Sequence, residues 1–100
     1  MRMIVEVVVL RAKAGAADHM RAGLQAARAV ISRAEGYQGS TFHQGIEDPL
    51  RFVLRIEWDT VEAHTQGFRG GPLFPEWRAL WAEHMDGAPD VMHFQVFAGP

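Results

Sequence analysis

His64, Arg78 and Trp58 are side chains that could carry chemistry, and the absence of cysteine excludes cysteine nucleophiles, disulfides and thiolate zinc sites. His64 has an ordinary pKa near neutrality, so it could act as a base or as a hydrogen-bond donor. Arg78 stays protonated and offers a planar set of donors that could stabilise an oxyanion. Trp58 could supply an indole N–H and a flat wall for an aromatic ligand. Together these residue types favour proton transfer and anion stabilisation.

Each of these residues also has a purely structural interpretation. His64 fits a surface histidine on a short helix, Arg78 fits a solvated arginine, and Trp58 fits plain core. The five histidines lack the HExxH pattern and paired helical spacing, so the sequence gives a metal site little support and we expect none. His43 and His93 are expected on strands and could meet in the interior, most simply as a structural hydrogen bond.

The composition describes an ordinary globular chain, and we expect residues 1–100 to form a single domain. Ten basic and twelve acidic residues, with Lys13 as the single lysine, argue against a nucleic-acid partner. The apolar start of the chain imitates a secretory signal, but Glu6 interrupts it, and no other targeting or membrane-spanning stretch occurs. We therefore expect a cytoplasmic protein with no membrane association.

Hydrophobic periodicity defines the elements that must position these side chains. Residues 3–11 are apolar on both alternating faces, and residues 50–58 alternate between an apolar face and a largely charged one. Along residues 16–34, small and apolar residues recur at spacings of three and four and form one stripe down a helix. A capping box over residues 59–62 starts a short helix, while Gly36, and later Gly87 with Pro89, end the longer ones. The expected order is a strand over 3–11, a helix over 16–34, strands over 39–46 and 50–58, helices over 59–68 and 72–84, and a strand over 91–97.

This order predicts an α+β fold of ferredoxin-like βαββαβ type, a four-stranded antiparallel sheet with its helices on one face. The helices can cover only one face, and the first strand is apolar on both, so a second copy is expected to cover the other. In such a face-to-face homodimer Arg51, Arg55, Glu57 and Glu6 could pair between or beneath the two sheets.

Three segments carry a resemblance to a known family. They are residues 55–64, where a tryptophan ends a strand and an acidic-capped helix follows at once, residues 68–77, which hold a phenylalanine-bearing helix start, and the glycine turn at residues 36–39. Over nearly the whole chain the sequence resembles the antibiotic biosynthesis monooxygenase family of dimeric α/β barrels.

The resemblance implies a cofactor-independent monooxygenase that oxidises a small aromatic, quinol-type substrate with dioxygen. The oxygenase branch acting on aromatic polyketides places its tryptophan at Trp58 and its arginine at Arg78. His64 occupies the position of that branch's tyrosine, and Leu54 the position of its asparagine. From these matched positions the resemblance implies His64, Arg78 and Trp58 as the catalytic residues, and no cofactor is expected. The expected substrate pocket comprises Val7, Leu54, Phe68, Phe74, Trp77 and Trp81.

Other branches of the family leave alternatives open. In the haem-degrading branch the resemblance places the asparagine of the first strand at Val7 and the iron-ligating histidine at Arg78, although His84 could in principle ligate a metal. A signal-molecule isomerase is a further possibility. A non-catalytic dimeric barrel that binds an apolar metabolite is favoured by Leu54, because one polar positioning group is then missing.

Overall fold

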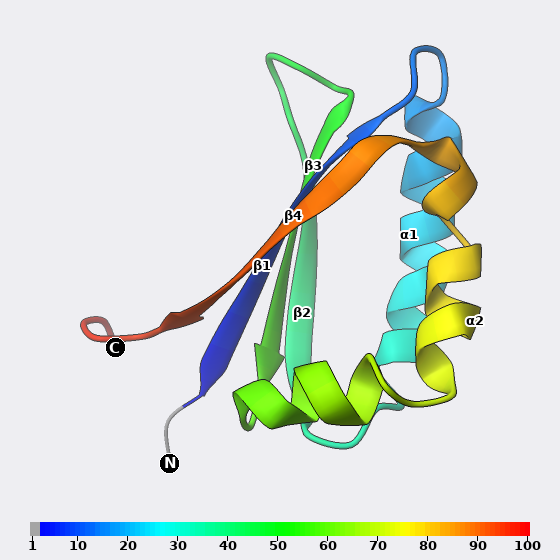
Figure 1. Ribbon diagram of the computed structural model, residues 1–100. Helices are drawn as coiled ribbons and strands as arrows, with labels where there is room; N and C mark the ends of the chain where they lie inside the picture. The colour runs from blue at the N-terminus through cyan, green and yellow to red at the C-terminus, as the bar shows by residue number, and fades with distance from the viewer. Residues whose placement is uncertain (1–2) are drawn as a thin grey trace.

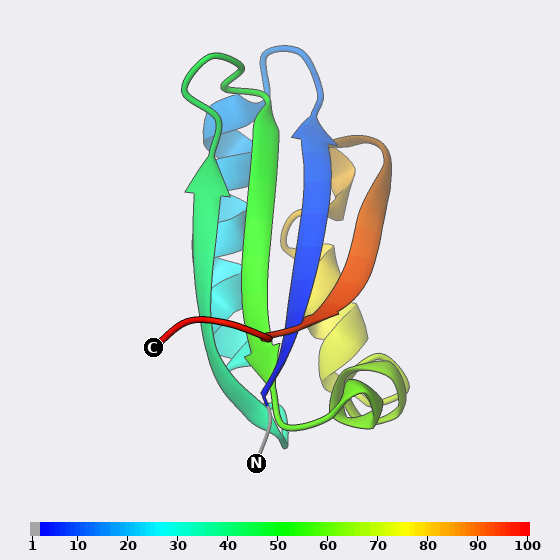
Figure 2. The same ribbon diagram turned by 90° about the vertical axis from the view of Figure 1, so that its left-hand side faces the viewer.

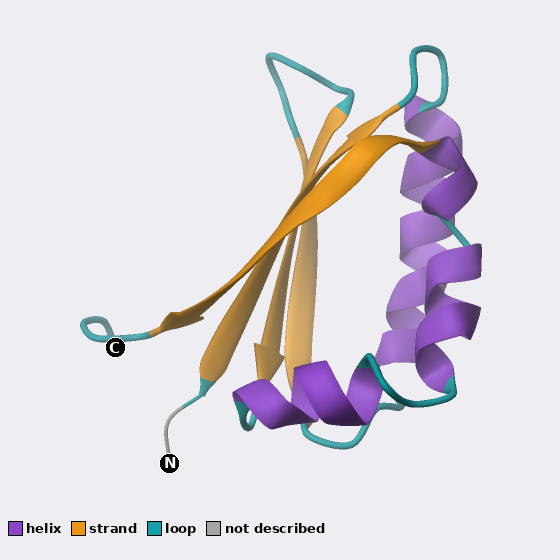
Figure 3. Ribbon diagram, viewed as in Figure 1, coloured by secondary structure: helices purple, strands orange, loops and turns teal. Residues whose placement is uncertain are grey.

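The computed structural model describes residues 3–100 and has one four-stranded sheet with helices on one of its faces (Figures 1 and 3). The strand order is β2-β3-β1-β4, and every neighbouring pair is antiparallel. The predicted ferredoxin-like βαββαβ fold is therefore confirmed. The elements are β1 (Ile4–Ala12), α1 (Ala17–Ile31), β2 (Tyr37–Gln44), β3 (Arg51–Trp58), the π-helix η1 (Ala63–Phe68), α2 (Leu73–Ala79), the 3₁₀ turn η2 (Ala82–His84) and β4 (Met85–Gln95).

The register of the sheet decides which side chains face the helices. Glu6 lies opposite Ile56 and Val8 opposite Leu54, so these four side chains share the helix-covered face. Arg55, on the other face, pairs with Glu57 at 3.3 Å. The predicted grouping of Glu6 with Arg51, Arg55 and Glu57 is therefore wrong, because the period of two places Glu6 on the opposite side of the sheet.

Helix α1 covers this face with the predicted apolar stripe, of which Met20, Leu24, Ala27 and Ile31 are buried. The helix ends at Ile31, earlier than predicted, and a tighter turn leads to Gly36. Gly36 has φ +86°, so it serves the turn into β2 and is not the cap of the helix. At Gly23 a Cβ atom would lie 2.2 Å from the Leu80 carbonyl oxygen, so glycine lets the chain after α2 approach α1 closely.

The cap of the segment after β3 lies one residue later than the predicted capping box over residues 59–62, since Thr60 Oγ1 accepts a hydrogen bond from the Ala63 N–H at 3.0 Å. The segment then winds as a π-helix, in which the Arg69 N–H bonds to the His64 carbonyl at 2.8 Å, five residues back. Both His64 and Phe68 are buried. The segment lies across one end of the space between the sheet and the helices (Figure 1).

The last strand begins six residues before its predicted start. Helix α2 stops at Ala79, and β4 starts at Met85 and pairs with β1. The register shifts between Val9 and Arg11, where Gly87 adopts φ +77° and Pro89 has no N–H to donate. The two residues expected to end a helix thus form an irregularity within a strand.

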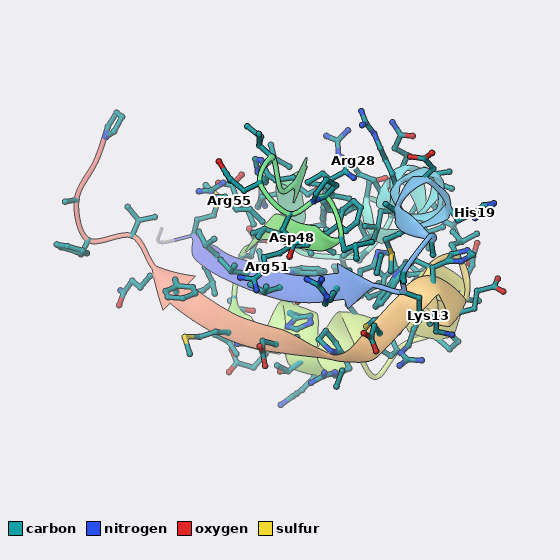
Figure 4. All side chains as sticks on the ribbon, turned by 90° about the horizontal axis from the view of Figure 1, so that it is seen from above. Lys13, His19, Arg28, Asp48, Arg51 and Arg55 are labelled. Atoms are coloured by element: carbon teal, nitrogen blue, oxygen red, sulfur yellow. The ribbon has the colours of Figure 1, made fainter. Side chains whose placement is uncertain are left out.

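The face of the sheet away from the helices is open in the described chain (Figure 2). On this side and in the C-terminal tail, Met92, Phe94, Val96 and Phe97 expose 48–97% of their surface. Figure 4 shows the tail carrying its side chains clear of the remaining elements. Within residues 3–100, no helix is both long and apolar enough to cross a lipid bilayer.

Candidate active site

A cavity of about 420 Å³ lies between α2 and the β1–β4 half of the sheet. Such a volume suits a small ring system. Four elements contribute to it: β1, η1, α2 and β4. Its lining residues are Glu6, Val8, His64, Arg69, Phe74, Trp77, Arg78, Trp81, Pro89 and Val91.

A buried carboxyl group lies at the floor of this cavity. Glu6 is 2% exposed, and its Oε1 accepts a hydrogen bond from the indole N–H of Trp58 at 2.8 Å. Its Oε2 lies 3.3 Å from His64 Nε2. Neighbouring strands and η1 thus bring three functional groups together from positions far apart in the sequence.

The second ring nitrogen of His64 is also engaged within the protein. His64 Nδ1 shares a hydrogen bond of 2.8 Å with His93 Nε2 on β4. His93 lies opposite Glu6 in the register of β1 and β4, so both project toward the helix layer. His64 itself is 4% exposed and stacks on Trp58 with ring centroids 5.5 Å apart.

Burial shifts the pKa values of the two central groups in opposite directions. Desolvation raises the pKa of Glu6 from 4.5 to about 7, against the opposing effects of the Trp58 hydrogen bond and the Arg69 charge. Desolvation lowers the pKa of His64 from 6.5 to about 4, with smaller electrostatic contributions from His93 and Arg69 in the same direction. At neutral pH His64 is therefore uncharged, and Glu6 exchanges its proton readily.

Two arginines at the rim give the cavity a positive character. Arg69 follows η1 and Arg78 lies in α2, and both line the cavity while remaining exposed. Neither forms an ion pair with any residue in the described range 3–100. Both guanidinium groups are thus available to an anion.

Aromatic rings form the wall on the helix side. Phe74, Trp77 and Trp81 line the cavity, and Trp77 meets Trp81 edge to face at 4.9 Å. Phe68 packs behind them against Phe74 and Trp77. The indole nitrogens of Trp77 and Trp81 are buried and have no hydrogen-bond partner within residues 3–100, so the wall offers the cavity mainly ring carbon.

The structure brings most of the predicted site residues together, but not all of them. His64 and Arg78 line the cavity, whereas Trp58 is completely buried and reaches it through Glu6. Leu54 is completely buried in the core and does not line the cavity. Val7 faces the open side of the sheet, in a shallow hollow with Met92 and Phe94.

The other histidines lie apart from the cavity. His43 contacts Thr41 at 3.0 Å on the open face, so the predicted meeting of His43 with His93 is wrong, because the register places them on opposite sides of the sheet. His84 stacks on His19 at 5.5 Å. Among the described residues, no three histidine, aspartate or glutamate side chains are placed to hold a metal ion together.

Glu6, His93 and Arg69 are the site residues that sequence reasoning missed. Glu6 could have been found, because it is the one charged residue on the alternate positions that include Val8 and Leu10. A lone carboxyl on a core-facing set signals a partner or a function. His93 becomes visible only with the register of β4, and no signal in the sequence singles out Arg69.

A second hollow, of about 460 Å³, lies between α1 and the β2–β3 hairpin. The polar side chains of Arg21 and Gln25, which line it, are exposed at the surface. It contains no buried titratable group, so the cavity that holds Glu6 and His64 is the candidate active site.

Comparison with known proteins agrees with this architecture. A sequence profile of a family described as "Antibiotic biosynthesis monooxygenase" matches residues 3–80. The chain belongs to the antibiotic biosynthesis monooxygenase family. The chain is also 33% identical over 93 residues to the uncharacterized protein YczJ of Bacillus subtilis, and the matched region covers 93% of this chain and 98% of YczJ.

Solved structures include further members of the antibiotic biosynthesis monooxygenase family. A proposed antibiotic biosynthesis monooxygenase of Bordetella bronchiseptica shares 35% identity with a TM-score of 0.93, over 98% of this chain and all of that one. SnoaB, a cofactor-independent oxygenase of Streptomyces nogalater, has a TM-score of 0.82 at 13% identity, over 97% and 95% of the two chains. The second likeness concerns the fold alone.

Proposed function

We propose that the chain is a cofactor-independent monooxygenase that oxidises a small aromatic, quinol-type substrate with dioxygen. One observation carries the proposal: the cavity combines a buried Glu6–His64 pair at its floor with aromatic walls and a free Arg78 at its rim. These are the requirements for generating an aromatic anion out of contact with water.

The reaction needs no outside electron donor. Removing a proton from a hydroquinone or an anthrone gives an electron-rich anion that can reduce dioxygen. An anthrone methylene and dioxygen become a carbonyl and water, so the substrate supplies all the electrons. The protein is then required to hold the substrate, to take the proton and to stabilise the developing negative charge.

Arg78 is assigned the role of oxyanion stabiliser, because its guanidinium lines the cavity and pairs with no described residue. His64 belongs to the acid–base network that takes the proton. Trp58 fixes that network, since it donates to Glu6 and stacks on His64. SnoaB supports the proposal to the extent that this fold can hold a cofactor-independent oxygenase.

We also propose that the protein works as a homodimer in which the open sheet faces meet. Met92 is 60% exposed and Phe94 is 48% exposed, and both accompany Val7 on this face. Apolar side chains grouped in this way favour contact with another surface. Sedimentation equilibrium should show a dimer that Phe94→Asp weakens, and a wild-type monomer at micromolar concentration would contradict this.

Oxygen uptake tests the proposed activity. Chelator-treated protein is given a panel of anthrones and hydroquinones, and wild type is compared with His64→Ala and Arg78→Ala. His19→Ala, a change at an exposed position of α1 outside the cavity, is the matched control. Uptake above the spontaneous rate that falls in both cavity variants and persists in the control supports the proposal, and no uptake with any substrate contradicts it.

Leu54 favours a second candidate, a barrel that binds an apolar metabolite without changing it. It is fully buried where the resembling oxygenases have asparagine, so one polar group for holding a substrate is missing. Recovery of a bound quinol chemically unchanged after prolonged incubation in air, as shown by mass spectrometry, would favour this candidate. An isomerised product of unchanged mass would instead indicate isomerase activity.

A further inference from the structure

Glu6 is the point at which the cavity meets the buried polar network. It lines the cavity, and its two oxygens are directed to different partners, Oε1 to the Trp58 indole and Oε2 to His64 Nε2. The indole can only donate, so it holds the carboxyl in place without competing for a proton. Because Glu6 lines the cavity, a substrate hydroxyl in the cavity can reach its carboxyl group.

His64 is poorly arranged to act on a substrate directly. Its Nε2 lies 3.3 Å from Glu6 Oε2, and its Nδ1 shares a hydrogen bond with His93 Nε2. Neither ring nitrogen is left for a third partner. The same arrangement makes His64 suitable for passing a proton from one neighbour to the other, because imidazole can release a proton at one nitrogen as it gains one at the other.

His93 extends the chain of contacts between Glu6 and His64 to the protein surface. It is partly exposed, whereas Glu6 and His64 are almost completely buried. Glu6, His64 and His93 thus form a continuous path from the cavity floor, through the core, to solvent. The path crosses three elements, β1, η1 and β4, which only the folded chain brings together.

The charges around Glu6 suit transient proton storage. Trp58 faces it from β3, His64 from η1 and His93 from β4, while Arg69 acts on it from beyond η1. Arg78 lines the same cavity from α2. Burial gives Glu6 a pKa of about 7 and keeps His64 neutral, so at neutral pH the carboxyl can both gain and lose a proton.

We propose that Glu6 takes the proton from a hydroxyl group of the aromatic ligand and that His64 and His93 pass it to solvent. In the first step the ligand O–H bond breaks and an O–H bond forms on Glu6. In the second, that proton moves to His64 Nε2 while the proton on His64 Nδ1 moves to His93 Nε2. The proton on His93 Nδ1 then leaves to water. One bond forms for each bond that breaks, and no electrons are transferred.

The proposal rests on the proposed function only for the kind of molecule in the cavity, an acidic aromatic hydroxyl compound. It makes Glu6 the catalytic residue that meets the substrate. His64 and His93 act through Glu6. It also gives a physical reason for a neutral histidine at this place, since a charged one would hold the proton instead of passing it on.

A phenol that cannot be oxidised tests the first step. Meta-nitrophenol, whose phenolate absorbs at longer wavelength than its neutral form, is titrated with protein at about pH 7.5, above the Glu6 pKa of about 7. Wild type should increase the phenolate band on binding. Glu6→Gln, which keeps an oxygen for Trp58, should lower the phenolate fraction of the bound ligand by about tenfold.

Glu35→Gln, an exposed position between α1 and β2 that lies outside the cavity, is the matched control and should behave as wild type. A phenolate band of undiminished size in Glu6→Gln would overturn the proposal, because Arg69 and Arg78 alone would then be ionising the ligand. A wild type that shows no phenolate band would overturn it as well.

The relay has its own test, the rate at which protons reach solution after mixing with meta-nitrophenol, followed by a pH indicator. His93→Gln should slow this release by about tenfold, and added imidazole should restore it. His19→Gln, at an exposed position of α1 outside the cavity, should change nothing. Release from His93→Gln at the wild-type rate would refute the relay.

These measurements are separate from oxygen consumption. If the phenolate band depends on Glu6 but no quinol is oxidised, the proton path stands and the monooxygenase proposal fails. If quinols are oxidised while Glu6→Gln retains full activity and the full phenolate band, the monooxygenase proposal stands and the proton path fails.

Discussion

Replacing Glu6 with glutamine should change how the stability of the protein depends on pH. The folded-state pKa of Glu6 is about 7 against 4.5 in the unfolded chain, so the folded state holds that proton more tightly. Its contribution to stability is complete below about pH 4.5 and is lost as the pH rises toward 7. At about 1.4 kcal/mol for each pH unit, the loss is about 3 kcal/mol.

His64 works in the opposite sense. Its folded-state pKa is about 4 against 6.5 in the unfolded chain, so the folded state binds that proton less tightly. Stability therefore rises by about 3 kcal/mol between about pH 4 and pH 6.5. Glu6 and His64 are only 2% and 4% exposed, so solvent screening reduces their contributions to the free energy of unfolding only slightly. In the wild type the two effects nearly cancel across this range.

Urea unfolding between pH 4 and 8, followed by tryptophan fluorescence at one protein concentration, measures how the free energy of unfolding of each variant changes with pH. Glu6→Gln should gain about 3 kcal/mol of stability as the pH rises, because the His64 effect alone remains. His64→Gln should lose about as much, and Glu35→Gln, a change at an exposed position outside the cavity, should follow the wild type. If Glu6→Gln parallels the wild type at every pH, the buried pair is not the source of the linkage and the reasoning is refuted.

Further substitutions test other parts of the structure. Trp58→Phe removes the hydrogen bond that lowers the Glu6 pKa, so the pH midpoint of phenolate formation should move upward, and an unchanged midpoint would count against that bond. Arg78→Gln should lower kcat/KM for quinol oxidation by about tenfold to a hundredfold with little change in the urea midpoint. A loss of activity accompanied by a clear fall in the urea midpoint would assign Arg78 a structural role. Gly23→Ala should cost about 1–3 kcal/mol of stability, since its Cβ would lie 2.2 Å from the Leu80 carbonyl oxygen, and a change below about 0.5 kcal/mol would show that the helices separate freely.

Much of the fold follows from local patterns that the structure confirms. The alternation in β3 and the stripe on α1 depend on neighbours along the chain, so the sequence carries them directly. The late start predicted for β4 has another origin. Gly87 and Pro89 are ordinary breakers, and only pairing with β1 makes them a bulge inside a strand.

The candidate site could be predicted only in part, for a related reason. His64 and Arg78 stand out by residue type and by resemblance, and both line the cavity. Glu6 and His93 acquire meaning from the register that brings β1 and β4 together. A titratable residue counts as functional once its neighbours are known, and those neighbours are distant in sequence.

The π-helical turn of η1 has a consequence for comparing this chain with its relatives. A π turn holds one residue more than an α turn, and here the additional residue falls between His64 and Arg69. A relative with an ordinary helix at this place would be one residue shorter. Gapless comparison would then pair each later side chain with a neighbour turned about 100° around the helix axis. Conserved cavity residues would be mistaken for substitutions, so relatives of this chain are best compared by superposition through this segment.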